Sequence, residues 1–234
     1  MKQQILIIIL LLDGIFFSSA SGQDTKFTIA AEGGPSLTNL YGNNQSKKYF
    51  KPIVGGYAGI LVQYNFSQYF SLRSGLTYER TGTNFLVDTY DVNADCIYRF
   101  DYVTIPVLFR AQYGTKVRFY INAGPYFSYL CNQQYLAKKG KKYDDITSEV
   151  NDAVPMNKNR TDYGIVGGLG IEIKIIHNAS ITIGVTDFLG LCNTKKQPPF
   201  TTATGEDLGF TTKTCNNSAI FHVGFSVDIG KTKQ

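Results

Sequence analysis

The sequence predicts an all-β protein, an eight-stranded antiparallel up-and-down barrel that spans a membrane. Three observations predict this fold. After about residue 23, apolar and polar residues alternate with the period of two that strands require, and helical periodicity is nearly absent. The links between the expected strands alternate between short and long. Beyond the N-terminal segment, no stretch approaches the roughly 18 apolar residues of a membrane-spanning helix.

The order of strands and links supports this prediction. Strands are expected at roughly residues 25–36, 53–66, 69–81, 98–113, 116–130, 162–175, 179–191 and 218–229. The links at 67–68, 114–115 and 176–178 are short enough for tight turns, whereas 37–52, 82–97, 131–161 and 192–217 are long and polar. All short turns would therefore lie at one end of the barrel. Outer-membrane barrels have this layout, with short periplasmic turns and long external loops.

The N-terminal segment is expected to be a signal peptide covering residues 1–22, which leaves residues 23–234 as the barrel domain. Lys2 gives a positive start, Ile5 to Leu12 form an apolar core, and small residues from Ser18 to Gly22 suit a signal peptidase. The alternative is a membrane anchor, but the apolar run is short and Asp13 interrupts it. Export and the barrel pattern together predict the bacterial outer membrane as the location.

Composition narrows the class of partner. Charged residues make up 18% of the chain, below the roughly 25% of soluble domains, and the aromatic residues are all Phe and Tyr. The net charge is +5, but the basic residues do not follow one element. We therefore expect no nucleic-acid partner.

Alternation alone does not tell which strand face points inward. A soluble lipocalin-like barrel would place the apolar face inside. However, the polar faces carry Gly, Ser, Thr, Asn and Tyr, whereas a face in water would carry Lys and Glu. The apolar face also has aromatic residues near strand ends, where membrane girdles form: Tyr64, Phe66, Phe70, Tyr129 and Tyr163. The apolar face is therefore expected to contact lipid.

This orientation places seven charged side chains in the lumen: Glu32, Arg73, Glu79, Arg110, Arg118, Glu172 and Lys174. Buried charges are stable only when they are paired and hydrogen-bonded. We expect these three acids and four bases to form a structural polar plug. The alternative is an ion-conducting path, although side chains just about fill an eight-stranded barrel.

The four cysteines all fall at the end of the barrel that carries the long links. An even count in an exported chain predicts disulfides. Of three possible pairings, the simplest is Cys96 with Cys131 and Cys192 with Cys215. A zinc site of four thiolates is the alternative, and no CxxC spacing supports it. We expect no metal and no cofactor.

Several short segments resemble the PorT-like outer membrane β-barrel domain of Bacteroidetes-type bacteria, often labelled "porin family". They are AEGGPSL (31–37), YER (78–80), YVTIPVL (102–108), YINAGPY (120–126) and GIVGGLG (164–170). Their order and spacing carry the resemblance over roughly residues 25–230. It implies an outer-membrane barrel, with a link to protein secretion in some members. One departure is the C-terminus, which lacks the final aromatic residue that the barrel assembly machinery reads and offers Phe225 instead.

No enzyme is predicted. The chain has no Gly-x-Ser-x-Gly motif, His177 falls in an expected turn, and His222 falls on the luminal face. The preferred hypothesis is a non-enzymatic barrel whose long loops bind surface partners, stabilise the envelope or serve secretion. The alternatives are a narrow channel for ions or very small solutes, and a barrel enzyme acting on envelope lipids. Expected partners are outer-membrane lipid and lipopolysaccharide, the barrel assembly machinery, and a surface or secretion partner protein.

Overall fold

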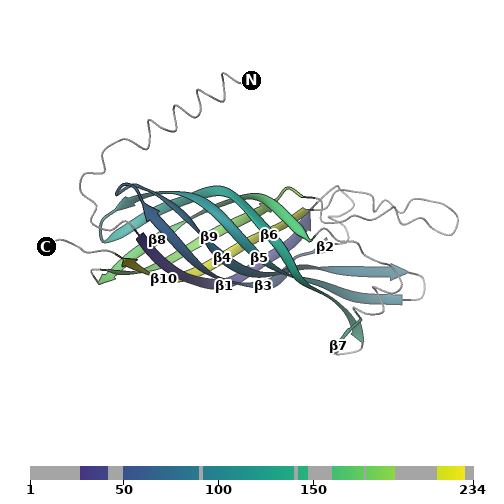
Figure 1. The fold of residues 1–234 in the computed structure, drawn as a ribbon. Helices are drawn as coiled ribbons and strands as arrows, with labels where there is room; N and C mark the ends of the chain where they lie inside the picture. Colours follow the sequence, from purple (N-terminus) through teal and green to yellow (C-terminus); the bar gives the residue numbers. More distant parts are fainter. Residues whose placement is uncertain are drawn as a thin grey trace, which may run out of the picture.

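The strands form a closed antiparallel barrel (Figure 1). The computed structural model describes residues 27–41, 50–89, 92–139, 142–146, 160–176, 178–192 and 215–229. Eight strands build the wall: β1 (Phe27–Tyr41), β3 (Ile53–Asn65), β4 (Phe70–Thr89), β5 (Val92–Gly114), β6 (Val117–Lys139), β8 (Thr161–Ile176), β9 (Ala179–Gly190) and β10 (Cys215–Ile229). Each pairs antiparallel with its neighbours along the chain, and β1 pairs with β10 from Phe27↔Ile229 to Tyr41↔Cys215. The predicted fold is confirmed.

Tight turns join the strands at one end of the barrel. Between β3 and β4, the backbone N–H groups of Tyr69 and Phe70 donate to Ser67 Oγ over 3.1 and 2.9 Å. Between β5 and β6, Gly114 adopts φ +126°, where a Cβ would also clash with the Val117 carbonyl. Only glycine adopts this conformation readily. These short turns mark the periplasmic end.

The apolar strand faces point outward, as predicted. Phe119 is 65% exposed and Phe221 50%, whereas their neighbours Tyr120 and His222 are buried. The same alternation continues around the wall. A continuous surface of exposed Phe, Ile, Leu and Val is compatible with lipid and not with water.

Aromatic pairs gather on this outer surface near the periplasmic turns. Tyr69 stacks on Tyr113 with ring centroids 6.3 Å apart, and the Phe27 and Tyr64 rings lie 5.2 Å apart. Exposed Tyr129 and Tyr163 lie near the other end of the barrel wall. Rings at these two levels fit the aromatic girdles of a membrane-spanning barrel.

The strands are longer at the external end than the sequence predicts. The expected loop 82–97 is wrong: β4 and β5 stay paired as far as Thr89↔Val92. The expected loop 131–161 is also partly strand, because β6 continues to Lys139 and pairs with β7 (Lys142–Asp145). Along the edge of β4 that does not face β5, β2 (Phe50–Lys51) pairs with β4. Figure 1 shows these segments extending past the barrel wall.

We name this extension the projecting sheet and define it as residues 84–89 of β4, 92–97 of β5, 131–139 of β6, and β7. Its polar composition suggested loops, but the segment 84–97 also holds Phe85, Leu86, Val87, Val92 and Ile97, which are apolar and mostly of high β-propensity. Cross-strand pairing supplies the backbone hydrogen bonds that a loop would leave to water.

Candidate functional site in the barrel lumen

The inward-facing side chains form layers along the barrel axis. The middle layer is apolar, and we call it the apolar layer: Tyr57, Leu108, Tyr126, Val166, Phe188 and Ile220. These six side chains come from six different strands. The Phe188 ring packs against the rings of Tyr126 and Tyr57, with centroids 5.2 and 6.4 Å away. Strand alternation places polar residues on either side of this layer.

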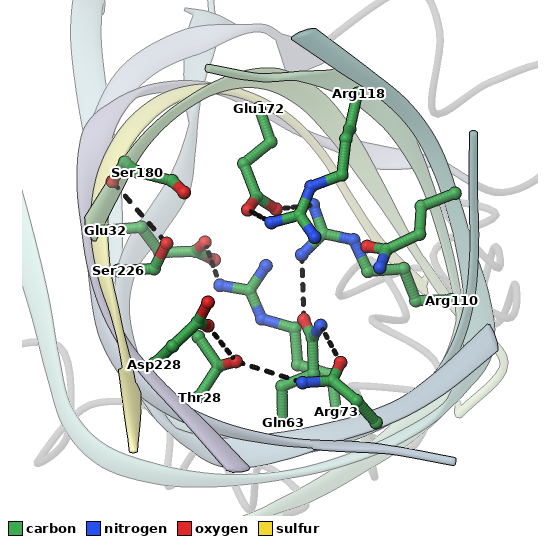
Figure 2. A network of polar contacts seen from close by, with 12 residues as sticks. Thr28, Glu32, Gln63, Arg73, Arg110, Arg118, Glu172, Ser180, Ser226 and Asp228 are labelled. Atoms are coloured by element: carbon green, nitrogen blue, oxygen red, sulfur yellow. Dashed lines mark hydrogen bonds and ion pairs between the residues drawn. The ribbon is translucent and has the colours of Figure 1, made fainter. Parts of the chain in front are cut away.

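An ionic network fills the lumen on the periplasmic side of the apolar layer (Figure 2). Arg73 Nη2 lies 2.6 Å from Glu32 Oε2. Glu172 accepts from Arg118 and lies 3.4 Å from Arg110 Nη2. Apart from Arg118, these side chains are more than nine-tenths buried. Five of the seven predicted luminal charges therefore meet here, from five strands: β1, β4, β5, β6 and β8.

Further polar groups continue the network toward the periplasm. Gln63 Oε1 accepts from Arg110 Nη1 over 2.9 Å, and Gln63 Nε2 donates to Asn65 Oδ1 over 2.7 Å. Asn65 Nδ2 donates to Thr28 Oγ1 over 3.1 Å, and Thr28 donates to Asp228 over 2.6 Å. Sequence reasoning missed these residues as part of the site. Their signal was the alternation itself, which puts Thr28, Gln63, Asn65 and Asp228 on inward positions of their strands.

Glu32 links the network to the apolar layer. Its carboxylate accepts a hydrogen bond of 2.7 Å from the Tyr57 hydroxyl and lies 3.7 Å from His222 Nδ1. His222 Nε2 is 3.3 Å from Thr186 Oγ1. His222 thus acts as a buried, hydrogen-bonded filler, and His177 lies outside the described residues.

Two glycines shape the wall beside this network. Tyr120, Gly170, Gly184 and His222 are directly paired across four strands. A Cβ on either glycine would clash with the Tyr120 hydroxyl. The ring of Tyr120 also carries the guanidinium of Arg110, whose Cζ is 3.8 Å from the ring centroid. This is a cation–π contact.

A second polar layer lies on the external side of the apolar layer. Glu79 accepts a hydrogen bond from Ser218, and Asn216 donates to Asp162 over 2.8 Å. Glu79 is buried and hydrogen-bonded, but it makes no salt bridge within the described ranges and so lies outside the ionic network. Farther toward the external end lies a second apolar cluster: Leu40, Phe100, Tyr102 and Leu130.

Lys174 lies near the periplasmic end of β8, opposite Ser180, and is partly exposed. It makes no salt bridge with the residues that the structure describes. Two of the seven predicted residues, Lys174 and Glu79, are therefore outside the ionic network. Both lie on inward strand positions, but at other levels along the barrel axis than the three arginines and the two carboxylates of the network.

The structure does not support the expected disulfides. Cys96, Cys131, Cys192 and Cys215 are all described and form no disulfide with one another. Cys96 pairs with Ala137, six positions beyond Cys131 in β6. Six strand residues span about 20 Å, whereas a disulfide needs Cα atoms within about 7 Å. Across the described ranges, no group of three or more His, Cys, Asp or Glu side chains could hold a metal ion.

The closed wall, the lipid-facing apolar surface and the aromatic girdles define an outer-membrane β-barrel. The sequence matches the outer membrane protein beta-barrel domain family over residues 18–190, and the chain belongs to this family. The protein is located in the outer membrane. No curated protein matches the sequence.

Several solved structures are similar to this chain. Neisserial surface protein A is 13% identical and matches with a TM-score of 0.47, covering 87% of this chain and 97% of its own. OprG of Pseudomonas aeruginosa is 12% identical, with a TM-score of 0.49 and coverage of 90% and 100%. Outer membrane protein W of E. coli is 12% identical, with a TM-score of 0.42 and coverage of 88% and 99%.

Proposed function

We propose that this protein is a sealed, non-enzymatic outer-membrane barrel that presents its projecting sheet to partners at the cell surface. The apolar layer carries this proposal. An ion that crossed the lumen would have to leave water and pass six packed apolar side chains, among them fully buried Ile220. Moving an unpaired charge into such surroundings is very costly.

The ionic network strengthens the seal. Glu32 is held by Arg73 and Tyr57, and Glu172 by Arg110 and Arg118. These contacts cross the lumen between strands that are not all neighbours, as Figure 2 shows. A solute would have to break several of them at once. The narrow channel remains the second candidate, because both polar layers could hold water.

The projecting sheet supports a role outside the membrane. It continues from β4, β5 and β6 at the end opposite the periplasmic turns. All four residues of β7 are exposed, including Lys142 and Tyr143. An anchor alone needs no such extension beyond the lipid. A surface or secretion partner protein is the ligand that we propose for it.

Two arginines near the external end of the barrel wall support our proposal that lipopolysaccharide is the lipid partner. Arg80 and Arg160 lie at the external end of the wall beside Tyr78 and Tyr129, with nitrogen–hydroxyl distances of 3.5 and 3.4 Å. Arginines beside interfacial tyrosines can contact lipid phosphates.

The PorT-like affiliation belongs to the same proposal. Its support is the set of motif segments, of which YINAGPY lies in β6 and GIVGGLG in β8, paired side by side. This affiliation implies a secretion-associated role as one form of the proposed surface function. The proposal includes cleavage of residues 1–22, which N-terminal sequencing of the mature protein would test, and insertion by the barrel assembly machinery.

Planar-bilayer conductance tests the seal. The purified barrel should give no current steps, whereas Phe188→Ala should open the apolar layer and produce them. Phe221→Ala is the matched control, because Phe221 faces lipid and its loss leaves the lumen unchanged. Regular current steps from the unmodified protein would overturn the proposal and favour the narrow channel.

Shortening the projecting sheet tests the surface role. Thr83 and Tyr98 are directly paired, so an Asn-Gly turn can join them and replace residues 84–97. We expect the full chain to form cross-links through Lys142 on intact cells. The shortened variant should assemble as a heat-modifiable barrel but lose these cross-links, because the part of β6 that pairs with β7 loses its own pairing with residues 96 and 97. Unchanged cross-linking would contradict a role for the sheet.

A further inference from the structure

The periplasmic side of the lumen holds an excess of buried positive charge. Three guanidinium groups, from Arg73, Arg110 and Arg118, face only two carboxylates, from Glu32 and Glu172. Figure 2 shows the three guanidinium groups converging near the barrel axis. Because arginine stays protonated in proteins, these five side chains carry one uncompensated positive charge.

No other described charge neutralises this excess locally. Asp228 and Lys174 lie at the periplasmic mouth and are partly exposed, and their opposite charges add nothing to the net charge there. Glu79 is six residues from Arg73 along β4, about 20 Å of strand. Asp162 lies in β8 on the other side of Val166 in the apolar layer. Both acids are therefore outside the ionic network.

The same place holds buried hydrogen-bond donors without a partner, and it also holds two unpaired acceptor atoms, Gln112 Oε1 and Asn122 Oδ1. The Nε atoms of Arg73, Arg110 and Arg118, the Nη2 atom of Arg110 and the Tyr120 hydroxyl are buried without a hydrogen-bond acceptor in the protein. Arg110 Nη2 is 3.4 Å from the Glu172 carboxylate but does not meet hydrogen-bond geometry. Arg73, Arg110 and Tyr120 are each at least nine-tenths buried. Buried donors are nearly always satisfied.

A bound anion would supply both the missing charge and the missing acceptor. We propose that the lumen binds a small monovalent anion, of the size of chloride, between the guanidinium groups of Arg73 and Arg110, with Arg118 and Tyr120 lining the same space. A single negative charge matches the excess of one, whereas sulfate or doubly charged phosphate would reverse its sign. The site would exist whether or not the barrel conducts, and it is independent of the projecting sheet.

The test is the replacement Gln63→Glu. Gln63 Oε1 already accepts a hydrogen bond from Arg110 Nη1 over 2.9 Å, so glutamate keeps this bond and adds the missing charge with almost no change of shape. Glutamate loses the hydrogen bond that Gln63 Nε2 donates to Asn65 Oδ1, so the Asn65 amide must turn over to donate to the new carboxylate. Gln68→Glu is the matched control, because Gln68 is exposed in the turn between β3 and β4. Both variants change the net charge equally.

The measurement is the urea concentration at which half of the refolded barrel is unfolded (the midpoint). It is taken at constant ionic strength in sodium chloride, bromide, sulfate or gluconate. We expect chloride and bromide to raise the midpoint above gluconate for the unmodified protein and for Gln68→Glu. In Gln63→Glu the halide affinity should fall at least about tenfold, as expected for loss of a charge-assisted interaction. Sulfate, which acts by exclusion from protein surfaces, should affect all three alike.

Three results would overturn the proposal: no halide effect on the unmodified protein, an equal effect in Gln63→Glu, or a sulfate effect that Gln63→Glu alone abolishes. Bromide diffraction gives an independent readout on the unmodified protein. An anomalous peak is expected between Arg73 and Arg110, and an empty density there at high bromide would also refute the site.

Discussion

Replacing Glu172 by glutamine should destabilise the barrel strongly. Glu172 comes from β8 and holds two guanidinium groups, those of Arg110 and Arg118. Removing one partner of a buried ion pair costs about 3–5 kcal/mol, because the remaining charge stays buried without compensation. Arg118 is 14% exposed and can turn partly toward water. We therefore expect a loss of about 3 kcal/mol in the free energy of unfolding, near the lower end of that range.

The control is Arg80→Gln, which breaks an ion pair outside the lumen. Arg80 Nε lies 2.8 Å from Asp101 Oδ1, but the Arg80 side chain is 46% exposed. The Asp101 side chain is only 8% exposed, but it keeps a hydrogen bond from Asn132 Nδ2 when Arg80 is lost. We therefore expect a cost of about 1 kcal/mol, at the upper end of the range for exposed pairs. Both variants exchange one charged side chain for glutamine, so the difference between their effects reports burial.

The assay is a urea titration of the barrel in detergent micelles. The chain contains no tryptophan, so far-ultraviolet circular dichroism and the mobility shift of unheated samples follow unfolding. The slope m should be unchanged, so that a shifted midpoint means changed stability. If Glu172→Gln and Arg80→Gln unfold at the same urea concentration, the ionic network is not what holds the lumen together, and the reasoning fails.

Three further outcomes are expected. Gly184→Ala should lower the yield of folded barrel on a refolding gel, because its Cβ would clash with the Tyr120 hydroxyl, and adding Tyr120→Phe should partly restore the yield. Gly167→Ala, which has open space around it, should leave the yield unchanged on the same gel. Ile220→Ala should cost about 2–4 kcal/mol in the urea titration, by leaving a cavity in the apolar layer. Leu169→Arg, in the middle of the lipid-facing side of β8, should cost about 2–4 kcal/mol in lipid vesicles; a neutral result would contradict the orientation of the wall.

The ionic network shows how far sequence reasoning reached. Period-two alternation assigned Glu32, Arg73, Arg110, Arg118 and Glu172 to one face, and the structure brings these five together. The same argument placed Glu79 among them, because alternation gives the face of a residue but not its height along the axis. Height depends on strand register and tilt, which are set by the whole closed sheet.

The projecting sheet and the cysteines show the opposite case. Polar composition made 82–97 look like a loop, yet pairing with its neighbours made most of it strand. Proximity in the predicted topology suggested a Cys96–Cys131 pair, but the β5–β6 register places Cys96 opposite Ala137. Both errors arise from long-range pairing, which no local pattern reports.

The sequence by itself therefore determined the barrel, its number of strands, the face that meets lipid and the end that carries the short turns. Each of these follows from local periodicity, turn residues and side-chain polarity, which act within a few residues. Only the tertiary structure decided which luminal charges meet, that an apolar layer separates them from Glu79 and Asp162, and that three guanidinium groups face two carboxylates in the ionic network. These depend on contacts between strands far apart in the chain, which exist only once the barrel has closed.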